Sequence, residues 1–239
     1  MIFLCFSVKD RIPLINDFYY YLLNFGLEVW YDRRNIFLGD PRYETNIRKG
    51  AANPNIRYAI VLYSKQFPTG NICLEEFRIL MDRYKKGNLT IFPIFLDGVP
   101  HTMTEGLNLC KELVYKEMTG YDSFCPIALH IMAKVTHDEL LDRSYKSIKD
   151  VIEAGDVDKT CAYYLLTEYE NIEKCNYAMR IAMLFSIYIV LTANRPRHYM
   201  HYKIANYLYH QSCIGVIIEE KRELQVMENI VVYEFGSLL

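Results

Sequence analysis

Residues 1–135 alternate between short apolar runs and longer amphipathic stretches, and this alternation constrains the fold more than any other feature of the chain. The apolar runs are rich in β-branched and aromatic residues, as strands are. They lie at Ile2–Phe6, Glu28–Tyr31, Tyr58–Tyr63 and Thr90–Leu96, with a weaker one near Leu113–Tyr115. Runs such as AIVLY and IFPIFL stay apolar at every position, which is typical of strands buried on both faces. Because strands that alternate with helices need crossover connections, we expect an α/β fold with a parallel sheet covered on both sides.

The stretches between these runs show helical spacing of their apolar residues. They lie at Ile12–Phe25, Tyr43–Lys49, Cys73–Lys85 and Ile127–Val135. In the first stretch Ile12, Ile15 and Leu22 recur at the spacing of one helix face. Gly26 follows where a C-terminal glycine cap belongs, so this helix is predicted to end there.

Ligands of open parallel sheets bind at the carboxyl ends of the strands. The loops at that edge are expected at Ser7–Arg11, Asp32–Arg42, Ser64–Asn71 and Asp97–Thr104. The loop over residues 32–42 is long for a connection between a strand and a helix. Long loops in compact domains are usually functional, so this loop is a candidate part of the site.

From about Thr136 the pattern changes to helices alone. These are predicted at Asp138–Ile152, Cys161–Tyr169, Asn176–Ala193, Arg197–Gln211 and Ile214–Phe235. Asp156 or Asp158 is a candidate N-cap for the second of them. The change of pattern predicts two domains, an α/β domain over residues 1–136 and an all-α C-terminal domain over residues 137–239.

The segment NYAMRIAMLFSIYIVLTA is apolar enough to raise the question of a membrane span. Arg180 interrupts it, and the remaining run Ile181–Ala193 has 13 residues, against about 20 needed to cross a bilayer. We therefore expect a central helix of the second domain and no membrane partner. Arg180 would then need a buried acidic partner or a route for its head group to solvent.

Charge and cysteine usage narrow the class of protein. The formal net charge is −2, so no basic field predicts a nucleic-acid partner. The seven cysteines are scattered without CxxC pairs or zinc spacing, which predicts no metal site and favours a reducing, cytoplasmic location. The opening MIFLCFSVKD lacks the basic region of a signal peptide. Only Cys5 and Cys73 invite a reactive-thiol interpretation, and neither has a neighbouring His in the sequence.

Six segments carry recognisable motifs in a fixed order: IFLCFSVKD, GLEVWYD, RRNIFLGDPR, YAIVLYSKQF, NICLEEF and IFPIFLDGVP. Any one of them is a weak signal, but together they resemble the TIR (Toll/interleukin-1 receptor) domain family over about residues 1–135. The resemblance implies a flavodoxin-like fold with a five-stranded parallel sheet. It also implies one of two activities, since TIR domains either act as assembly modules or cleave NAD.

The resemblance to the NAD-cleaving members places their catalytic glutamate at Glu76, four positions after a motif Trp that is Ile72 here. Glu75 is adjacent, but successive helical residues point about 100° apart and cannot share one role. Breaking the nicotinamide–ribose bond releases a neutral base and passes through a ribosyl cation. One carboxylate can stabilise that cation and accept the proton of the nucleophile. NAD would then be the substrate, with no cofactor and no metal.

The same resemblance assigns further positions on the substrate side. They are Phe6, Ser7, Asp32, Arg33, Arg34, Gly39, Ile72 and Cys73. The Phe6 ring could pack on nicotinamide, although a core aromatic fits that position equally. Arg33 and Arg34 could meet the pyrophosphate or an acidic neighbouring subunit, or simply be solvated. Gly39 is expected to serve backbone geometry, and Asp32 is expected to be structural.

Two departures from the family pattern bear on assembly. Ile72 replaces the Trp, so ring stacking from that position is lost. Phe37 and Leu38 replace a more polar pair before Gly39, and an exposed apolar tip would suit packing against another protomer. In this family the corresponding loop takes part in head-to-tail assembly, which can form filaments. We therefore expect oligomerisation to complete or switch on the site.

The leading hypothesis is an NAD-consuming enzyme that gives ADP-ribose or a cyclic or conjugated form of it, which a downstream effector could sense, in antiviral (anti-phage) defence. The alternative is a non-catalytic TIR adaptor that acts by TIR–TIR assembly. A flavodoxin-like cofactor module is disfavoured because SVKDR is not a Ser/Thr/Gly-rich phosphate loop. In the second domain, His198, His201, His210 and the tyrosines of residues 199–209 could line a pocket, but their spacing favours a packed helical core.

Overall fold

The structure is a computed structural model that describes residues 1–97, 113–155 and 160–238. The chain divides into two compact units, Met1–Phe124 and Cys125–Leu239. The boundary falls at the start of helix α6 (Phe124–Asp138), whereas the sequence pattern places that helix in the first domain. Asp156, Asp158 and the loop beyond Asp97 lie outside the described residues, so the predictions made for them are not addressed.

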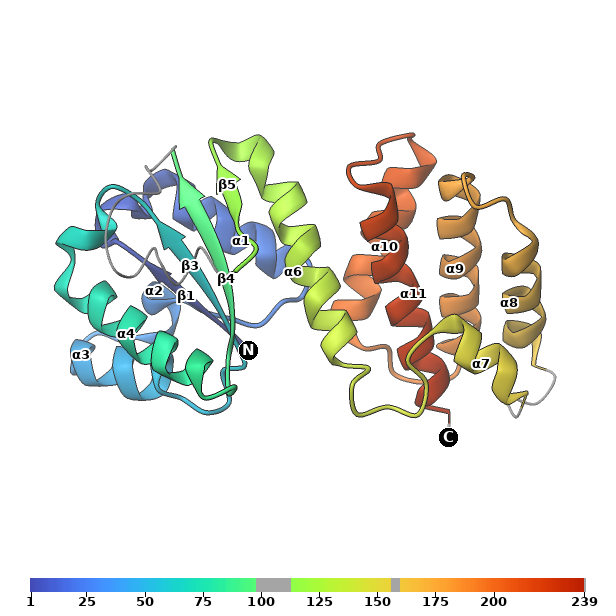
Figure 1. The fold of residues 1–239 in the computed structure, drawn as a ribbon, viewed down its shortest axis with the longest axis horizontal. Helices are drawn as coiled ribbons and strands as arrows, with labels where there is room; N and C mark the ends of the chain where they lie inside the picture. Colours follow the sequence, from blue (N-terminus) through green and yellow to red (C-terminus); the bar gives the residue numbers. More distant parts are fainter. Residues whose placement is uncertain (98–112, 156–159, 239) are drawn as a thin grey trace. The chain divides into compact units, whose positions relative to one another are not determined.

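The first unit contains a five-stranded, all-parallel sheet (Figure 1) in the order β2-β1-β3-β4-β5. Its strands are β1 (Ile2–Phe6), β2 (Val29–Trp30), β3 (Tyr58–Tyr63), β4 (Thr90–Leu96) and β5 (Lys116–Met118). The three long strands have the predicted bounds, and β1 and β3 are buried at every position. The fifth strand follows the predicted residues 113–115 rather than occupying them. The predicted parallel α/β sheet is confirmed.

Helices connect the strands as the alternation requires. They are α1 (Asn16–Asn24), α2 (Asp32–Asn35), α3 (Arg42–Glu44), a π-helical segment (Thr45–Ala51) and α4 (Asn71–Lys85). The prediction that the first helix starts at Ile12 is wrong. Ile12 has φ −117° and ψ 132° and is 65% exposed, because the ring of Pro13 disfavours helical geometry in the residue before it. The helix ends as predicted at Gly26, which has φ 73°.

Helix α4 packs against one face of the sheet and brings its first two turns to the carboxyl ends of β1 and β3. Its buried residues Phe77 and Leu80 join Phe3, Cys5 and Val61 in one apolar cluster. Burial of such side chains contributes roughly 1.5–3 kcal/mol each, so the position of α4 against the sheet is firmly determined.

The second unit is helical, with α7 (Ile148–Ala154), α8 (Cys161–Asn171), α9 (Tyr177–Leu191), α10 (Tyr199–Cys213) and α11 (Glu220–Gly236) following α6. The predicted helix over 138–152 is mostly wrong, since α7 begins only after Ser147. There the Ser147 hydroxyl accepts a hydrogen bond from the Asp150 amide (3.2 Å) while the Asp150 carboxylate accepts one from the Ser147 amide (2.9 Å). This capping box starts a new helix. Thr160 caps α8.

Helix α9 is the central helix of this unit, in contact with α8, α10 and α11. Its 15 residues span about 22 Å, and no helix in the described part of the chain is long and apolar enough to cross a membrane. Arg180 donates to the Tyr169 hydroxyl (2.5 Å) and lies 3.6 Å from the Glu228 carboxylate. The acidic partner predicted for Arg180 is thus Glu228, although the Glu228 side chain is 34% exposed rather than buried.

Candidate active site

A cavity of about 360 Å³ opens at the carboxyl edge of the sheet, where the end of β1, the residues after β2 and the first turns of α4 meet. We call it the Glu76 cavity. Its lining consists of Leu4, Phe6, Val8, Arg11, Asp32, Arg42, Asn46, Gly70, Asn71, Ile72, Cys73 and Glu76. The parallel topology predicts a ligand site at this edge, because the carboxyl ends of neighbouring strands open there.

Glu76 lies in the second turn of α4 and is only 4% exposed. The side-chain amide of Asn46 donates a short hydrogen bond to its Oε1. Asn46 in turn accepts a hydrogen bond from the indole nitrogen of Trp30 (3.4 Å). A chain of three side chains from β2, the π-helical segment and α4 therefore fixes the orientation of the carboxylate.

Gly50 allows the hydrogen bonds from Trp30 to Asn46 and from Asn46 to Glu76 to form. A Cβ at that position would lie 2.6 Å from the ring of Phe3 and 2.9 Å from the indole nitrogen of Trp30. Such distances are closer than carbon and nitrogen atoms pack without displacement. The absence of a side chain at Gly50 lets the indole sit where it can reach Asn46.

The environment of Glu76 favours its protonated form. Burial raises the pKa of this carboxyl to about 8, from an ordinary value of 4.5. A hydrogen bond from the Cys5 thiol acts to lower the pKa, and the negative charge of Asp32 adds to the rise. A carboxylate with a pKa near neutrality can both carry negative charge and accept a proton, which suits a general base.

Glu75 is placed differently, as the helical geometry predicts. Its carboxylate accepts a hydrogen bond from the Tyr43 hydroxyl at the exposed side of α4, and it does not line the Glu76 cavity. The adjacent carboxylates thus have separate surroundings, one buried and one solvated.

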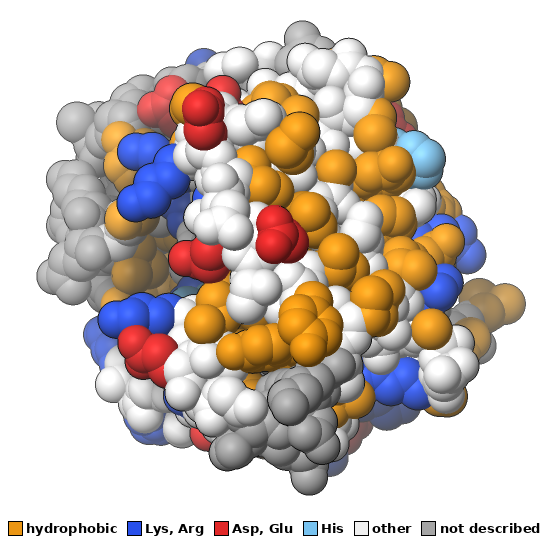
Figure 2. Space-filling view, turned by 90° about the vertical axis from the view of Figure 1, so that its right-hand side faces the viewer, with side chains coloured by type: hydrophobic (Ala, Val, Ile, Leu, Met, Phe, Trp, Pro, Cys, Tyr) orange, Lys and Arg blue, Asp and Glu red, His pale blue; other side chains and the backbone are white. Residues whose placement is uncertain are grey.

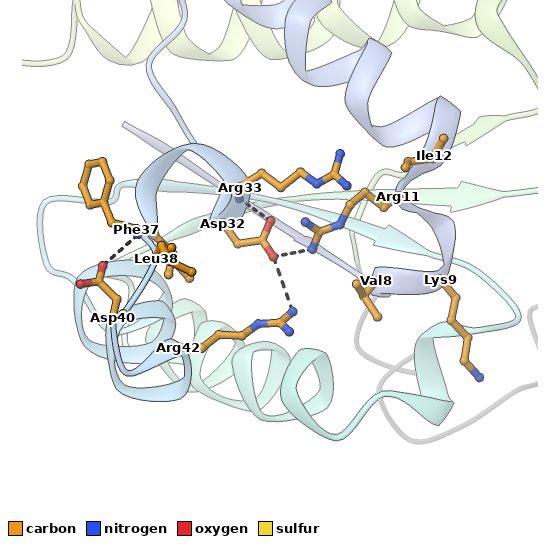
Figure 3. A pocket seen from close by; sticks show the side chains of 12 residues that line it. Val8, Lys9, Arg11, Ile12, Asp32, Arg33, Phe37, Leu38, Asp40 and Arg42 are labelled. Atoms are coloured by element: carbon orange, nitrogen blue, oxygen red, sulfur yellow. Dashed lines mark hydrogen bonds and ion pairs between the residues drawn. The ribbon is translucent and has the colours of Figure 1, made fainter.

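Asp32 holds two arginines at the mouth of the Glu76 cavity. It pairs closely with Arg11 and lies 3.8 Å from Arg42, as Figure 3 shows. The Arg11 guanidinium also lies 5.3 Å from the centre of the Phe6 ring. Two guanidinium groups around one carboxylate leave a net positive charge beside the cavity, which favours an anionic group there.

A second cavity of about 620 Å³ shares Val8, Arg11, Asp32 and Arg42 with the first and extends along the loop after α2. We call it the loop cavity (Figure 3). Its other lining residues are Lys9, Ile12, Arg33, Ile36, Phe37, Leu38, Gly39 and Asp40. Gly39 has φ 95°, a left-handed conformation that glycine adopts readily, as expected for a residue serving backbone geometry.

The structure groups most of the predicted site residues around these two cavities. Phe6, Asp32, Ile72 and Cys73 line the Glu76 cavity with Glu76, and Arg33 and Gly39 line the loop cavity. Two predicted residues line neither. Ser7 is buried at the end of β1, and Arg34 donates to the Tyr20 hydroxyl and packs over its ring.

Arg11, Arg42 and Asn46 line the Glu76 cavity but were not among the predicted site residues. Arg11 and Arg42 are the last residues of two of the four loops predicted to border a ligand, so the topology rule could have found them. Asn46 lies inside a helical stretch and contacts Glu76 only through tertiary packing, so no local pattern marks it.

The thiols of Cys73, which lines the Glu76 cavity, and of Cys5, which is buried beside Glu76, are unsuited to nucleophilic chemistry at neutral pH. Burial and the charge of Glu76 raise the pKa of Cys73 to about 11, and burial raises that of Cys5 well above its usual range. Both therefore stay as thiols rather than thiolates. Among the described residues, no group of three or more His, Cys, Asp or Glu side chains is arranged to hold a metal ion.

The five parallel strands, with a candidate site at their carboxyl edge, define a doubly wound α/β domain of the flavodoxin type. The family model of the TIR domain matches residues 2–125, more than half of the chain. The chain belongs to the TIR domain family, as its motifs predict.

Two known proteins are similar to this chain. The 2' cyclic ADP-D-ribose synthase BtTIR of Bacteroides thetaiotaomicron is 31% identical over 93 residues, which are 39% of this chain. The match spans 31% of the length of that relative. Among solved structures, the TIR domains of the activated Roq1 resistosome directly recognizing the pathogen effector XopQ are 17% identical, with a TM-score of 0.43. That similarity covers 56% of this chain and 98% of the other.

Proposed function

We propose that the TIR unit cleaves the nicotinamide–ribose bond of NAD and that Glu76 is its catalytic residue. The observation that carries this proposal is a buried carboxyl with a pKa of about 8, oriented by the Asn46 amide on the wall of a cavity. Perturbed carboxyls in clefts are typical of catalytic sites. NAD-type chemistry is supported by the matched relative, whose name is that of a cyclic ADP-ribose synthase.

In the proposed step the bond between the ribose C1′ and the nicotinamide nitrogen breaks, and its electron pair stays on nicotinamide, which leaves neutral. The ionised carboxylate of Glu76 stabilises the positive charge that develops on the ribose. An oxygen nucleophile then bonds to C1′, and its proton passes to Glu76. Water as nucleophile gives ADP-ribose, and a hydroxyl of the same molecule gives a cyclic product. We propose no metal or cofactor for either reaction.

The arginines at the cavity mouth complement this chemistry. Arg11 and Arg42 would face the pyrophosphate, while Asp32 holds both guanidinium groups in place. Phe6 would pack against the nicotinamide ring. The loop cavity, which shares these arginines, has room for the part of the dinucleotide beyond the pyrophosphate.

We further propose that the enzyme works in antiviral defence in the cytoplasm, with a downstream effector responding to its product, and that assembly of TIR units switches it on. Phe37 and Leu38 support assembly, because both are largely exposed on the loop that closes the loop cavity. Exposed apolar side chains of this size usually mark a protein contact.

Nicotinamide release from NAD, measured chromatographically, tests the proposed activity. Glu76→Gln is expected to lower the rate at least about 100-fold, and Glu75→Gln, the matched control one residue away, to leave it within about twofold because its carboxylate is solvated. Mass spectrometry separates ADP-ribose from a cyclic product lighter by one water. If the wild type, concentrated or assembled, releases no more nicotinamide than Glu76→Gln, the adaptor alternative replaces the enzyme.

A further inference from the structure

Helix α9 of the helical unit has an outward face without a single charged side chain. The residues of α9 that are exposed or half-buried on the side away from Arg180 are Ala178, Met179, Ala182, Phe185, Ser186, Ile189 and Val190. We call this set the α9 face. Met179 is 54% exposed and Ser186 is exposed as well. The only charged residue of α9, Arg180, is buried on the opposite side.

A face of this kind is unusual on a helix that meets solvent. Surface helices normally carry polar residues outward, and a helix that is apolar all round is normally buried all round. The apolar surface continues onto α10, because the ring of Tyr209 stacks on Phe185 at 4.4 Å between ring centres. Figure 2 faces the right-hand side of Figure 1, where α8 and α9 lie, and shows many hydrophobic side chains on that side, with polar and acidic ones among them. The α9 face therefore requires a further packing partner.

The shape of the α9 face suits another helix. Ala178, Ala182 and Ser186 follow one another at intervals of four residues and form a row of small side chains. Larger apolar side chains, such as Met179 and Ile189, flank the row. A row of small residues between larger ones lets the ridge of a second helix approach closely.

The charges at the two ends of α9 indicate which kind of helix could pack on the α9 face. Glu173 is exposed at the turn before α9 with Lys174 beside it, and Glu170 is exposed in the last turn of α8. Arg197 is exposed in the segment that follows α9, whereas Arg195 in the same segment is already ion-paired with Glu234. The two ends, about 22 Å apart, thus carry opposite charge. An antiparallel copy of α9 would set each acidic end against a basic end, and a parallel copy would set like charges together.

We propose that the α9 face is a self-association surface on which a second copy of this chain packs, α9 against antiparallel α9, about a two-fold axis. Such an interface is isologous, so the same residues serve both protomers and the assembly closes as a dimer. Glu173 of each protomer then faces Arg197 of the other. This dimer is independent of NAD cleavage and of contacts made by the TIR loop.

The mass of the full chain in solution, followed by sedimentation velocity across concentrations, tests this dimer. At roughly 10 µM we expect twice the chain mass of 28.2 kDa. Ser186→Glu places a carboxylate in the apolar interface and is expected to weaken the dimer roughly 100-fold. Because Glu favours a helix more than Ser does, this variant keeps the helix intact. Ser144→Glu makes the same change at an exposed turn before α7 and should leave the dimer unchanged.

Charge reversal tests the antiparallel arrangement. Glu173→Arg and Arg197→Glu are each expected to weaken the dimer severalfold, and the two together to restore it, because reversed charges again face each other. Leu38→Ser, on the TIR loop, should leave the dimer intact. A monomer at all concentrations, a dimer that survives Ser186→Glu, or an association lost in Leu38→Ser instead would overturn the proposal.

Discussion

Two carboxylates, one in each unit, are equally shielded from solvent: Glu76 and Glu234 are both 4% exposed. Glu234 on α11 receives a charged hydrogen bond from Arg195 (2.5 Å) and lies 3.2 Å from the ring of His201. Glu76 receives its hydrogen bonds from a neutral amide and a neutral thiol. The protein therefore neutralises one buried carboxylate with cationic partners and leaves the other with neutral ones.

The partners of Glu234 form a structural network. His201 is fully buried, and its second ring nitrogen lies 2.8 Å from Glu139, at the end of α6. Burial alone would lower the pKa of His201, but hydrogen bonds to Glu139 and Glu234 outweigh it and raise the pKa. The His201 ring thus joins α10 to α11 and to the residue that follows α6. Each oxygen of the Glu234 carboxylate therefore has a protein partner, and the side chain is buried away from solvent.

Glu76 differs from Glu234 because its hydrogen-bond donors are neutral rather than cationic, and its burial destabilises the folded unit at neutral pH. Folding raises its pKa from 4.5 to about 8, so between these values the folded chain keeps a proton that the unfolded chain releases. The free energy of unfolding therefore falls as pH rises through this window. Destabilised groups of this kind are typical of functional sites.

The largest effects on stability should come from replacing each of the two carboxylates, one at a time, with a neutral side chain. Glu234→Gln leaves the half-buried Arg195 and the buried His201 against an uncharged partner and is expected to cost about 3 kcal/mol, since breaking a buried ion pair is costly. Glu76→Gln should instead raise the stability of the TIR unit by roughly 1–3 kcal/mol at pH 7.

The two outcomes are measurable separately. Fluorescence of Trp30, the single tryptophan, follows unfolding of the TIR unit, and far-ultraviolet circular dichroism follows the helices. Glu76→Gln should raise the fluorescence midpoint more at pH 8 than at pH 5. A loss of stability in this variant at pH 8 would remove the contrast between the two carboxylates.

A smaller effect is expected from Asn46→Ala, which removes the amide that holds Glu76. Loss of this donor should raise the pKa of Glu76 further and free its side chain. We expect kcat to fall about tenfold and the pH midpoint of nicotinamide release to move to higher pH. Asn88→Ala, in the exposed turn after α4, is the control. A pH midpoint that does not move in Asn46→Ala would show that Asn46 does not act through the carboxylate.

The smallest effect concerns Ile72, which lines the Glu76 cavity where other family members have a tryptophan. Ile72→Trp would supply a ring to stack on nicotinamide and is expected to lower KM a fewfold, since aromatic stacking contributes about 1 kcal/mol. Steady-state kinetics with NAD measure this change. A raised KM would mean that the site is built around the smaller side chain.

How far the sequence predicts the fold differs between the two units. Strands β1, β3 and β4 were predicted to the residue because burial on both faces leaves an unbroken apolar signal. Strand β5, with three residues at the sheet edge, carries too short a signal to place. In the helical unit the predicted helix over 138–152 ignored Ser147, whose capping box decides where α7 begins.

Some residues of the candidate site could likewise be predicted from the sequence, and others could not. Glu76 was located by motif order, and Phe6, Ile72 and Cys73 followed from the same register. Asn46 could not be predicted, because its contact with Glu76 depends on the approach of Trp30 that Gly50 permits. Likewise, the sequence predicts that Arg180 needs an acidic partner or a route to solvent, but only the packing of the helices identifies Glu228 as that partner.

The pH dependence of kcat/KM for nicotinamide release tests most directly whether Glu76 carries the reaction. If the ionised carboxylate acts, kcat/KM should rise about tenfold per pH unit well below 8 and level off above about 8, after subtraction of the rate of Glu76→Gln at each pH. The direction follows from the raised pKa, since ever fewer molecules hold the ionised form as pH falls. A profile that is level from pH 6 to 9, or that falls with rising pH, would contradict the account.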